Sequence, residues 1–165
     1  MPLDIPDGTR CFVDSNILHY ALIPTFDTSA ACLELVDRAI AGIVSFSVRV
    51  QILADVVHKA MISEAAQLAG RERSKIVGYL KKHPEIISRL VEWPKAIERL
   101  KSVPLQILSS DIDLVFDAAH LATAHGLLTN DAMIVALMHR HGITHLATND
   151  DDFDRVPGIT VWKPR

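Results

Sequence analysis

Four aspartates fall within five positions near the C-terminal end of the chain, in the segment HLATNDDDFDRV (residues 145–156). Asp150, Asp151, Asp152 and Asp154 follow a short apolar run and surround an aromatic residue. Carboxylates this close repel one another, so each is harder to ionise than it would be alone. A solvated acidic turn explains such a segment, and so does a binding site for a cation. The positions of the other acidic residues have to decide between the two.

Asp14, far from the cluster in sequence, and Asp150, within it, both follow predicted strands. Asp14 comes directly after the apolar run CFV, and Asp150 comes after LAT and one asparagine. In open α/β sheets, ligands bind in the crevice beyond the carboxyl ends of the strands, so the two side chains are expected to meet there. Asp131 lies in the first turn of a predicted helix, where the helix dipole favours a carboxylate. Asp55 lies within another predicted helix and can point at the same crevice.

Carboxylates gathered from several elements suit a hard cation such as Mg²⁺ or Mn²⁺, which prefers oxygen ligands. A cation held in this way polarises a phosphate and lowers the pKa of a bound water, so that a nucleophile forms near neutral pH. No candidate for covalent catalysis competes strongly. The sequence has no G-x-S-x-G motif and no P-loop, and neither cysteine lies in an obviously activating setting.

The composition is that of one globular domain. The chain has 165 residues, of which 49% are hydrophobic, and this is enough to bury a real core. Its polar N-terminal segment lacks the pattern of a signal peptide, and no apolar run is long enough to predict a membrane span. Cys11 and Cys32 form no C-x-x-C pair and are typical of buried free thiols in a reducing compartment. We therefore expect a cytoplasmic protein of a single domain, residues 1–165.

Strand and helix patterns alternate along the chain. Residues 10–18 predict a strand that ends in a loop at Asp14, and further strands are predicted at 43–47, 105–110, 144–148 and 158–164. Helices are predicted at 28–42, 48–62, 111–126 and 130–142. Residues 63–103 are helical and charged, with interruptions at His83-Pro84 and Trp93-Pro94. This order predicts an α/β fold with a mainly parallel sheet covered on both faces.

Four segments then carry a resemblance to a known family. They are FVDSNIL (12–18), SFSVRVQILADVVHKA (45–60), LLTNDAMIVALM (127–138) and HLATNDDDFDRVPGITV (145–161). In this order they resemble the successive motifs of the PIN-domain nucleases, the fold of the toxin half of VapBC-type toxin–antitoxin pairs. The last segment is the most specific. The resemblance implies a three-layer α/β/α sandwich and a Mg²⁺- or Mn²⁺-dependent endoribonuclease that leaves a 5′-phosphate.

The resemblance also assigns roles to residues of this chain. Metal ligation falls to Asp14, Asp131 and Asp150, with Asp152 in support, and the catalytic set consists of Asp14, Asp55, Asp131 and Asp150. Further polar residues of the first and last motifs are candidates for orienting the ligands or a phosphate, although a role in turns explains them equally well. These supporting candidates are Ser15, Asn16, Thr148 and Asn149.

The second motif departs from the family pattern, which usually has glutamate where this chain has Asp55. Aspartate is shorter by one methylene, so its carboxylate would reach a metal ion only through water. A solvated helix face is nearly as good an explanation, because Asp55 lies away from the apolar stripe of Val50, Leu53, Val57 and Met61.

Basic residues concentrate between residues 71 and 101, where nine lysines or arginines stand against four glutamates. Phosphate backbones attract such patches, and a solvated helix face of mixed charge is an equally good explanation. The candidate contacts to RNA are Arg71, Arg73, Lys75, Lys81 and Lys82.

The sequence thus predicts a metal-dependent ribonuclease, the toxin of a type II toxin–antitoxin pair. Its expected partners are an RNA substrate, a cognate antitoxin and a second copy of the chain in a homodimer, but no membrane. Two alternatives stay open. One is a PIN nuclease of RNA processing, and the other is a catalytically weak PIN-like module that binds RNA or protein.

Overall fold

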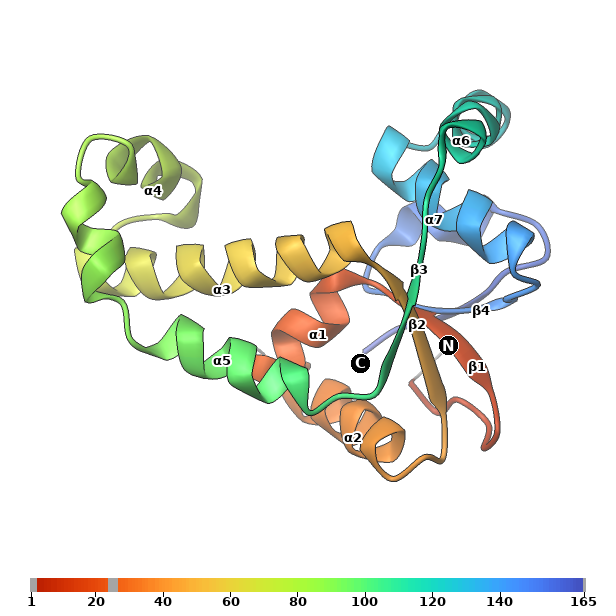
Figure 1. Cartoon of the computed structure of the whole chain (residues 1–165), viewed down its shortest axis with the longest axis horizontal. Coiled ribbons are helices and arrows are strands. Elements are labelled where there is room, and N and C mark those ends of the chain that lie inside the picture. The colour runs from red at the N-terminus through yellow and green to blue at the C-terminus, as the bar shows by residue number, and fades with distance from the viewer. Residues whose placement is uncertain (1–2, 24–26, 165) are drawn as a thin grey trace.

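The computed structural model describes residues 3–23 and 27–164. A five-stranded sheet with the order β3-β2-β1-β4-β5 lies at its centre, and every pair of neighbouring strands is parallel (Figure 1). This confirms the predicted parallel α/β sheet, although the second strand begins at Ser45 rather than Ile43. The strands are β1 (Arg10–Val13), β2 (Ser45–Arg49), β3 (Leu105–Leu108), β4 (His145–Ala147) and β5 (Thr160–Trp162).

The helices form two groups, and Figure 1 shows one on each side of the strands, which gives the three layers expected. One group contains α1 (Ser15–Leu22), α2 (Ser29–Ile40), α3 (Val50–Ala69) and α5 (Glu92–Lys101). The other is α6 (Ile112–His125) packed on α7 (Thr129–Arg140). Helix α4 (Arg73–Leu80) and the 3-10 helix η1 (Pro84–Arg89) lie beside the far end of α3 (Figure 1).

Helix α1 replaces the loop that the sequence predicts after the first strand. Asp14 is its N-cap, because a side-chain oxygen of Asp14 accepts a hydrogen bond from the backbone N–H of Ser15 at 2.5 Å. The helix then buries Ile17 and Leu18, and one turn later Ala21 and Leu22. With eight residues, it is too short for this spacing to stand out from that of a strand followed by a turn.

Helix α3 differs from its prediction in length and in orientation. It continues to Ala69 instead of ending at Ile62. Its buried face contains Ile52, Val56 and Ala60, whereas Val50, the first residue of the predicted apolar stripe, is 59% exposed. The true buried face is therefore displaced by one position from the predicted stripe.

The far part of α3, together with α4, η1 and α5, forms what we call the helical arm (residues 63–101). Its own small core consists of Ala65, Ala66, Ile76, Leu80 and Leu90. The predicted break at His83-Pro84 is correct, since Pro84 begins η1. The break predicted at Trp93-Pro94 lies slightly earlier, at Leu90 and Val91 between η1 and α5. Pro94 itself lies in the first turn of α5, where a helix does not need the missing N–H.

Both cysteines are free and buried, as predicted, and burial raises the pKa of each thiol to about 12. Neither is therefore a thiolate near neutral pH. Among the described residues, no single helix is both long and apolar enough to cross a membrane. Only α6 and α7 taken as a pair meet that test, and they are bent by 111° where they join.

A side chain of α3 fixes the start of α5. The carboxylate of Glu64 accepts hydrogen bonds from the backbone N–H groups of Val91, Glu92 and Trp93, at distances from 2.7 to 3.0 Å. Burial alone would raise the pKa of Glu64, but these three N–H groups and the charge of Lys95 lower it overall. Glu64 therefore acts as an N-cap supplied from another helix, and it holds the arm in place.

Replacing Glu64 with alanine is expected to lower the free energy of unfolding by about 1–2 kcal/mol, the usual contribution of an N-cap. Urea denaturation measures the change. The matched control is Glu72→Ala, which removes an exposed ion pair with Lys75 and should cost less than about 1 kcal/mol. Equal effects of the two substitutions would show that the Glu64 cap does not stabilise the arm.

Candidate active site

Strand β1 lies between β2 and β4, so the chain runs to β2 and β3 on one side of it and to β4 and β5 on the other. The crevice beyond the carboxyl ends of the strands at such a reversal is where open parallel sheets bind ligands. Asp14 follows β1, Arg49 ends β2 and Thr148 follows β4. Three neighbouring strands thus deliver polar side chains to one place.

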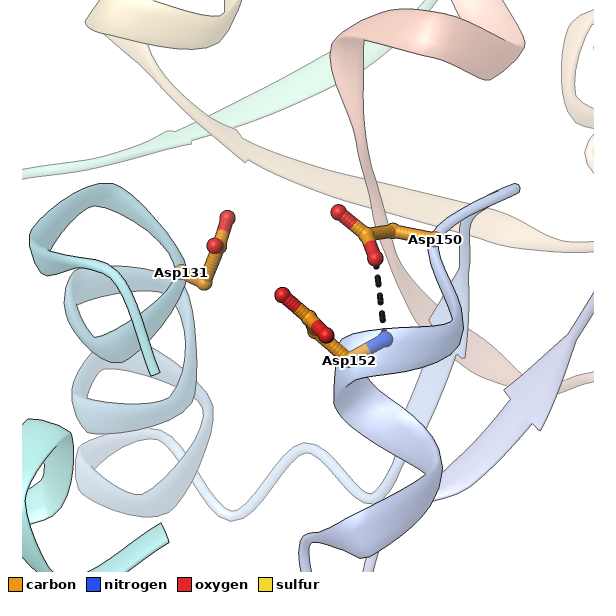
Figure 2. Close-up of side chains that lie close together, drawn as sticks. All are labelled: Asp131, Asp150 and Asp152. Atoms are coloured by element: carbon orange, nitrogen blue, oxygen red, sulfur yellow. Dashed lines mark hydrogen bonds between the residues drawn. The ribbon is translucent and has the colours of Figure 1, made fainter. Parts of the chain in front are cut away.

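Three carboxylates lie together at this crevice. Asp131, Asp150 and Asp152 are all half-buried, and each offers an oxygen atom within 4.8 Å of those of the others (Figure 2). Asp131 comes from the first turn of α7, and the other two come from the start of the 3-10 helix η2 (Asp151–Arg155) and its N-cap. Such a group of oxygen donors suits Mg²⁺ or Mn²⁺.

The four clustered aspartates of this segment divide into two pairs. Asp150 accepts a hydrogen bond from the backbone N–H of Asp152 at 2.9 Å, and both side chains face the crevice (Figure 2). Asp151 and Asp154 form ion pairs with Lys163, just beyond β5, while Asp152 also pairs with Arg155 at the end of η2. The cation-site explanation therefore fits the first pair, and the solvated-turn explanation fits the second.

Asp14 is not one of these three carboxylates, and both of its oxygen atoms accept hydrogen bonds. One oxygen, Oδ2, accepts hydrogen bonds from Asn16 Nδ2 at 2.7 Å and from Thr148 Oγ1 at 2.8 Å. The other, Oδ1, accepts the backbone N–H of Ser15. A carboxylate oxygen has two lone pairs, so Oδ1 can still bind a cation.

Hydrogen bonds of the predicted supporting residues connect the start of α1 to the loop after β4 and order that loop. Asn16 Oδ1 accepts the backbone N–H of Asn149 at 3.1 Å, and Thr148 Oγ1 accepts that of Asp150 at 3.1 Å. Ser15 instead accepts a hydrogen bond from Lys59 Nζ at 2.7 Å, a contact that the sequence did not suggest. These bonds hold the carboxylates in place.

Asp55 does not join the three-carboxylate group. It is an exposed residue in the second turn of α3. Its carboxylate is the foremost of the negative charges that act on Arg49, ahead of those of Asp131 and Asp14. Asp55 is thus near enough to act on the charge of Arg49, without belonging to the carboxylate group.

Arg49 is the residue of this site that the sequence analysis missed. It is only 3% exposed, and its Nη2 donates a hydrogen bond to Asn130 Oδ1 at 2.9 Å. Its Nε is buried without a hydrogen-bond partner in the described structure. Burial lowers the pKa of Arg49, while the surrounding carboxylates raise it, and a guanidinium stays charged in either case. The signal available in the sequence was an arginine at the end of a predicted strand, directly before a predicted helix.

The ionisation of Asp131 reflects this crowding. Burial first, and then the charges of Asp150, Asp14 and Asp152, raise the pKa of Asp131 to about 6, against the lowering effect of Arg49. The ionised form of Asp131 is therefore disfavoured in the folded protein. A bound cation would offset this effect, since it favours the ionised carboxylate.

Asp131→Asn is expected to stabilise the metal-free protein at neutral pH. The folded-state pKa of about 6 lies above the unfolded value of about 3.9, so the native state binds the proton more tightly. Wild-type stability therefore falls as pH rises from about 4 to about 6, and the neutral asparagine removes this loss. Thermal melts in EDTA should show a higher melting temperature for the variant above that range. A difference that does not shrink toward acid pH would contradict the assignment.

The five candidate RNA contacts lie in or beside the helical arm. Figure 1 shows α4 at the end of α3 that is remote from α7 and β4. The Arg71 guanidinium lies 4.0 Å from the centre of the Tyr79 ring, Lys75 pairs with Glu72, and Lys81 and Lys82 are exposed. Only Arg73 lines a cavity that also contains a residue of the crevice, Asn16.

Comparison with known proteins identifies the family. Residues 11–159 match the family model of the PIN domain. The chain belongs to the PIN-domain family. A curated relative is ribonuclease VapC6 of Methanocaldococcus jannaschii, which is 35% identical over 69 residues, or 42% of this chain. The match spans 45% of that relative's length.

Solved structures show the same fold. VapBC2 from Rickettsia felis, crystallised with a DNA fragment from its promoter, matches with a TM-score of 0.56 and 17% identity, over 94% of this chain and 98% of that one. PAE2754 from Pyrobaculum aerophilum matches with a TM-score of 0.56 and 16% identity, over 93% and 90%. The PIN-like α/β/α architecture therefore extends over nearly the whole chain.

Proposed function

We propose that this PIN domain is a metal-dependent endoribonuclease. The observation that carries the proposal is the group of three carboxylates, Asp131, Asp150 and Asp152, at the reversal point of the sheet. The similarity to a ribonuclease over part of the chain supports RNA as the substrate. Oxygen donors and excess negative charge are what a divalent cation requires.

The three grouped carboxylates would hold Mg²⁺ or Mn²⁺, with Asp14 as a further ligand. A bound ion supplies Lewis acidity toward a phosphate and lowers the pKa of a water molecule. Asn16 and Thr148 keep Asp14 oriented through its Oδ2, so that Oδ1 stays available. Such fixed positions matter, because displacements of about 1 Å can cost a large factor in rate.

The proposal also gives a role to Arg49. A substrate phosphate is negative, and the carboxylates of the crevice would repel it. Arg49 adds a permanent positive charge behind them, held by Asn130 and close enough to act on Asp14, Asp55 and Asp131. Charges in a water-poor site interact more strongly than in bulk water, so this buried guanidinium lowers the repulsion that an approaching phosphate meets.

We also propose that the protein is the toxin of a type II toxin–antitoxin pair, with a protein antitoxin as partner. The likeness of its fold to the VapBC2 complex supports this role. A small DNA-binding protein encoded in the neighbouring reading frame, which copurifies with this chain and blocks cleavage, would support it. A free nuclease with no such neighbour would favour RNA processing instead. Light scattering on the purified chain tests the expected homodimer.

Asp150→Asn is expected to lower metal-dependent cleavage of single-stranded RNA by about 100-fold or more, with the fold intact by circular dichroism. The matched control is Asp151→Asn, the next residue, whose carboxylate pairs with Lys163 away from the crevice. It should cleave at the wild-type rate. Equal rates for wild type and both variants would remove the carboxylate group from the reaction.

The same proteins give a readout that is independent of activity. If the metal binds only the folded state, ~10 mM Mg²⁺ against a millimolar Kd adds roughly 1.4 kcal/mol of stability. Wild type and Asp151→Asn should show this gain in thermal melts, and Asp150→Asn should show little of it. Loss of cleavage without loss of this gain would assign Asp150 a role other than binding metal.

Asp55→Glu is expected to raise the rate of cleavage at limiting metal. The longer side chain keeps the charge and adds one methylene, which would bring the carboxylate closer to the metal if Asp55 belongs to the site. Glutamate is also a slightly better helix former than aspartate, so α3 should tolerate it. Titration of Mg²⁺ against the rate, with Asp55→Ala as the opposite change, measures the effect. Superimposable titrations for all three proteins would place Asp55 outside the site and assign it to a solvated helix face.

A further inference from the structure

A cavity of about 260 Å³ lies between α1, α3 and the start of α4. Such a volume is slightly below the ~300 Å³ at which pockets for drug-sized ligands begin. It is open to solvent and has both polar and apolar walls. The residues used below are Asn16, His19 and Tyr20 from α1, His58 and Lys59 from α3, and Arg73 from α4.

This cavity adjoins the carboxylate crevice. Asn16 lines the cavity and also donates a hydrogen bond to Asp14 Oδ2 at 2.7 Å. Lys59, another lining residue, donates to Ser15 Oγ at 2.7 Å, directly after Asp14 in the chain. Because Asn16 borders both the carboxylates and the cavity, a ligand that extends past Asn16 enters the cavity.

The charge of the cavity is opposite to that of the crevice. Its described lining includes Lys59 and Arg73 but no carboxylate. Both cations act on the buried His19: after burial, their charges lower the pKa of His19 to about 4, so its ring is neutral at physiological pH. The crevice thus favours a cation, and the cavity beside it favours an anionic group such as a phosphate.

The inner wall offers flat rings and a fixed hydrogen-bond pattern. Ser63 Oγ donates to the backbone carbonyl of Lys59 at 2.8 Å, so it can only accept from His19 Nε2, which lies 3.2 Å away. His19 is therefore assigned the tautomer with the hydrogen on Nε2. The half-buried Tyr20 ring lies 5.9 Å from the His19 ring, centre to centre. Aromatic rings of this kind stack on nucleic-acid bases whatever their identity.

We propose that this cavity binds one nucleotide of single-stranded RNA, next to the bond that is cleaved at the carboxylates. The base lies against Tyr20, and the phosphate lies between Lys59 and Arg73. The inference rests on the ribonuclease function proposed above. Single-stranded RNA fits because its bases can turn out of the stack and enter separate pockets. A basic peptide is disfavoured by the positive charge of the cavity.

The test measures binding rather than cleavage, in the Asp150→Asn protein. Fluorescence anisotropy with a labelled single-stranded oligoribonucleotide gives the association constant over a range of salt. For single strands, each phosphate contact contributes about 0.7 to the slope of log K against log salt concentration. Removing both cations by Lys59→Gln and Arg73→Gln should therefore weaken binding and reduce the slope by about 0.7, because the two cations share one phosphate.

The matched control removes the same amount of charge elsewhere. Lys95 and Lys101 are exposed on α5 and already paired with Glu92 and Glu98, each at 2.6 Å. Lys95→Gln with Lys101→Gln should leave the slope at the value of the parent protein. If both double variants lower the slope equally, the effect is general electrostatics, and the proposed subsite is wrong.

A third variant tests the base. Tyr20→Leu, checked for folding by circular dichroism, should weaken binding roughly 10-fold, as expected for one lost stacking contact, without changing the slope. An unchanged affinity would overturn the placement of the base. Competition by an acidic peptide as strong as that by RNA would assign the cavity to a protein partner, and would also overturn the proposal.

The outcomes separate this inference from the proposed function. If wild type cleaves RNA with Mg²⁺ but the Lys59/Arg73 variant binds with the parent's affinity and slope, the subsite is wrong and the nuclease stands. If the slope falls as expected but wild type never cleaves RNA with any divalent cation, the subsite stands and the nuclease proposal fails.

Discussion

The two hydrogen bonds to Asp14 Oδ2, from Asn16 and Thr148, hold the site together. The bond from Thr148 joins Asp14, directly after β1, to the loop after β4, and the pairing of these two central strands brings the two segments side by side. The backbone continues the same link, since Asp14 N–H donates to the carbonyl of Ala147. Because the loop after β4 also carries Asp150, the position of the carboxylate group depends on this junction.

The junction also brings several carboxylates close together, and neighbouring cations offset part of their repulsion. Carboxylates delivered to one crevice repel one another, and this repulsion adds to the larger effect of burial in raising the pKa of Asp131. Two responses are visible in the structure. Lys163 pairs with Asp151 and Asp154, and the buried Arg49 is close enough to interact with the charges of Asp55, Asp131 and Asp14. The remaining negative charge is what a divalent cation would neutralise.

The sequence was sufficient wherever a local pattern specified the structure. Strand ends placed Asp14 and Asp150 at one edge of a parallel sheet, and the sheet itself is as predicted. Features that depend on distant contacts were not predictable in this way. Arg49 finds its partner Asn130 81 positions away along the chain, and Glu64 caps a helix that starts 28 positions later. No periodicity reveals such pairs. The short helix α1 was also not predicted, because Asp14 directly follows a strand and was interpreted as the start of a loop, whereas it is the N-cap of α1.

The helical arm connects the fold to the choice of substrate. Arg73 opens α4, and Ile76 and Leu80 of that helix pack on Ala65 and Ala66 of α3. This small core, and not the main sheet, fixes where Arg73 lies relative to Lys59 on the same α3. A change that loosens the arm would therefore move one cation of the cavity while leaving the carboxylates in place. The cations of the cavity and the acidic site are thus supported by separate parts of the core, so the proposed strand binding could vary without disturbing the acidic site.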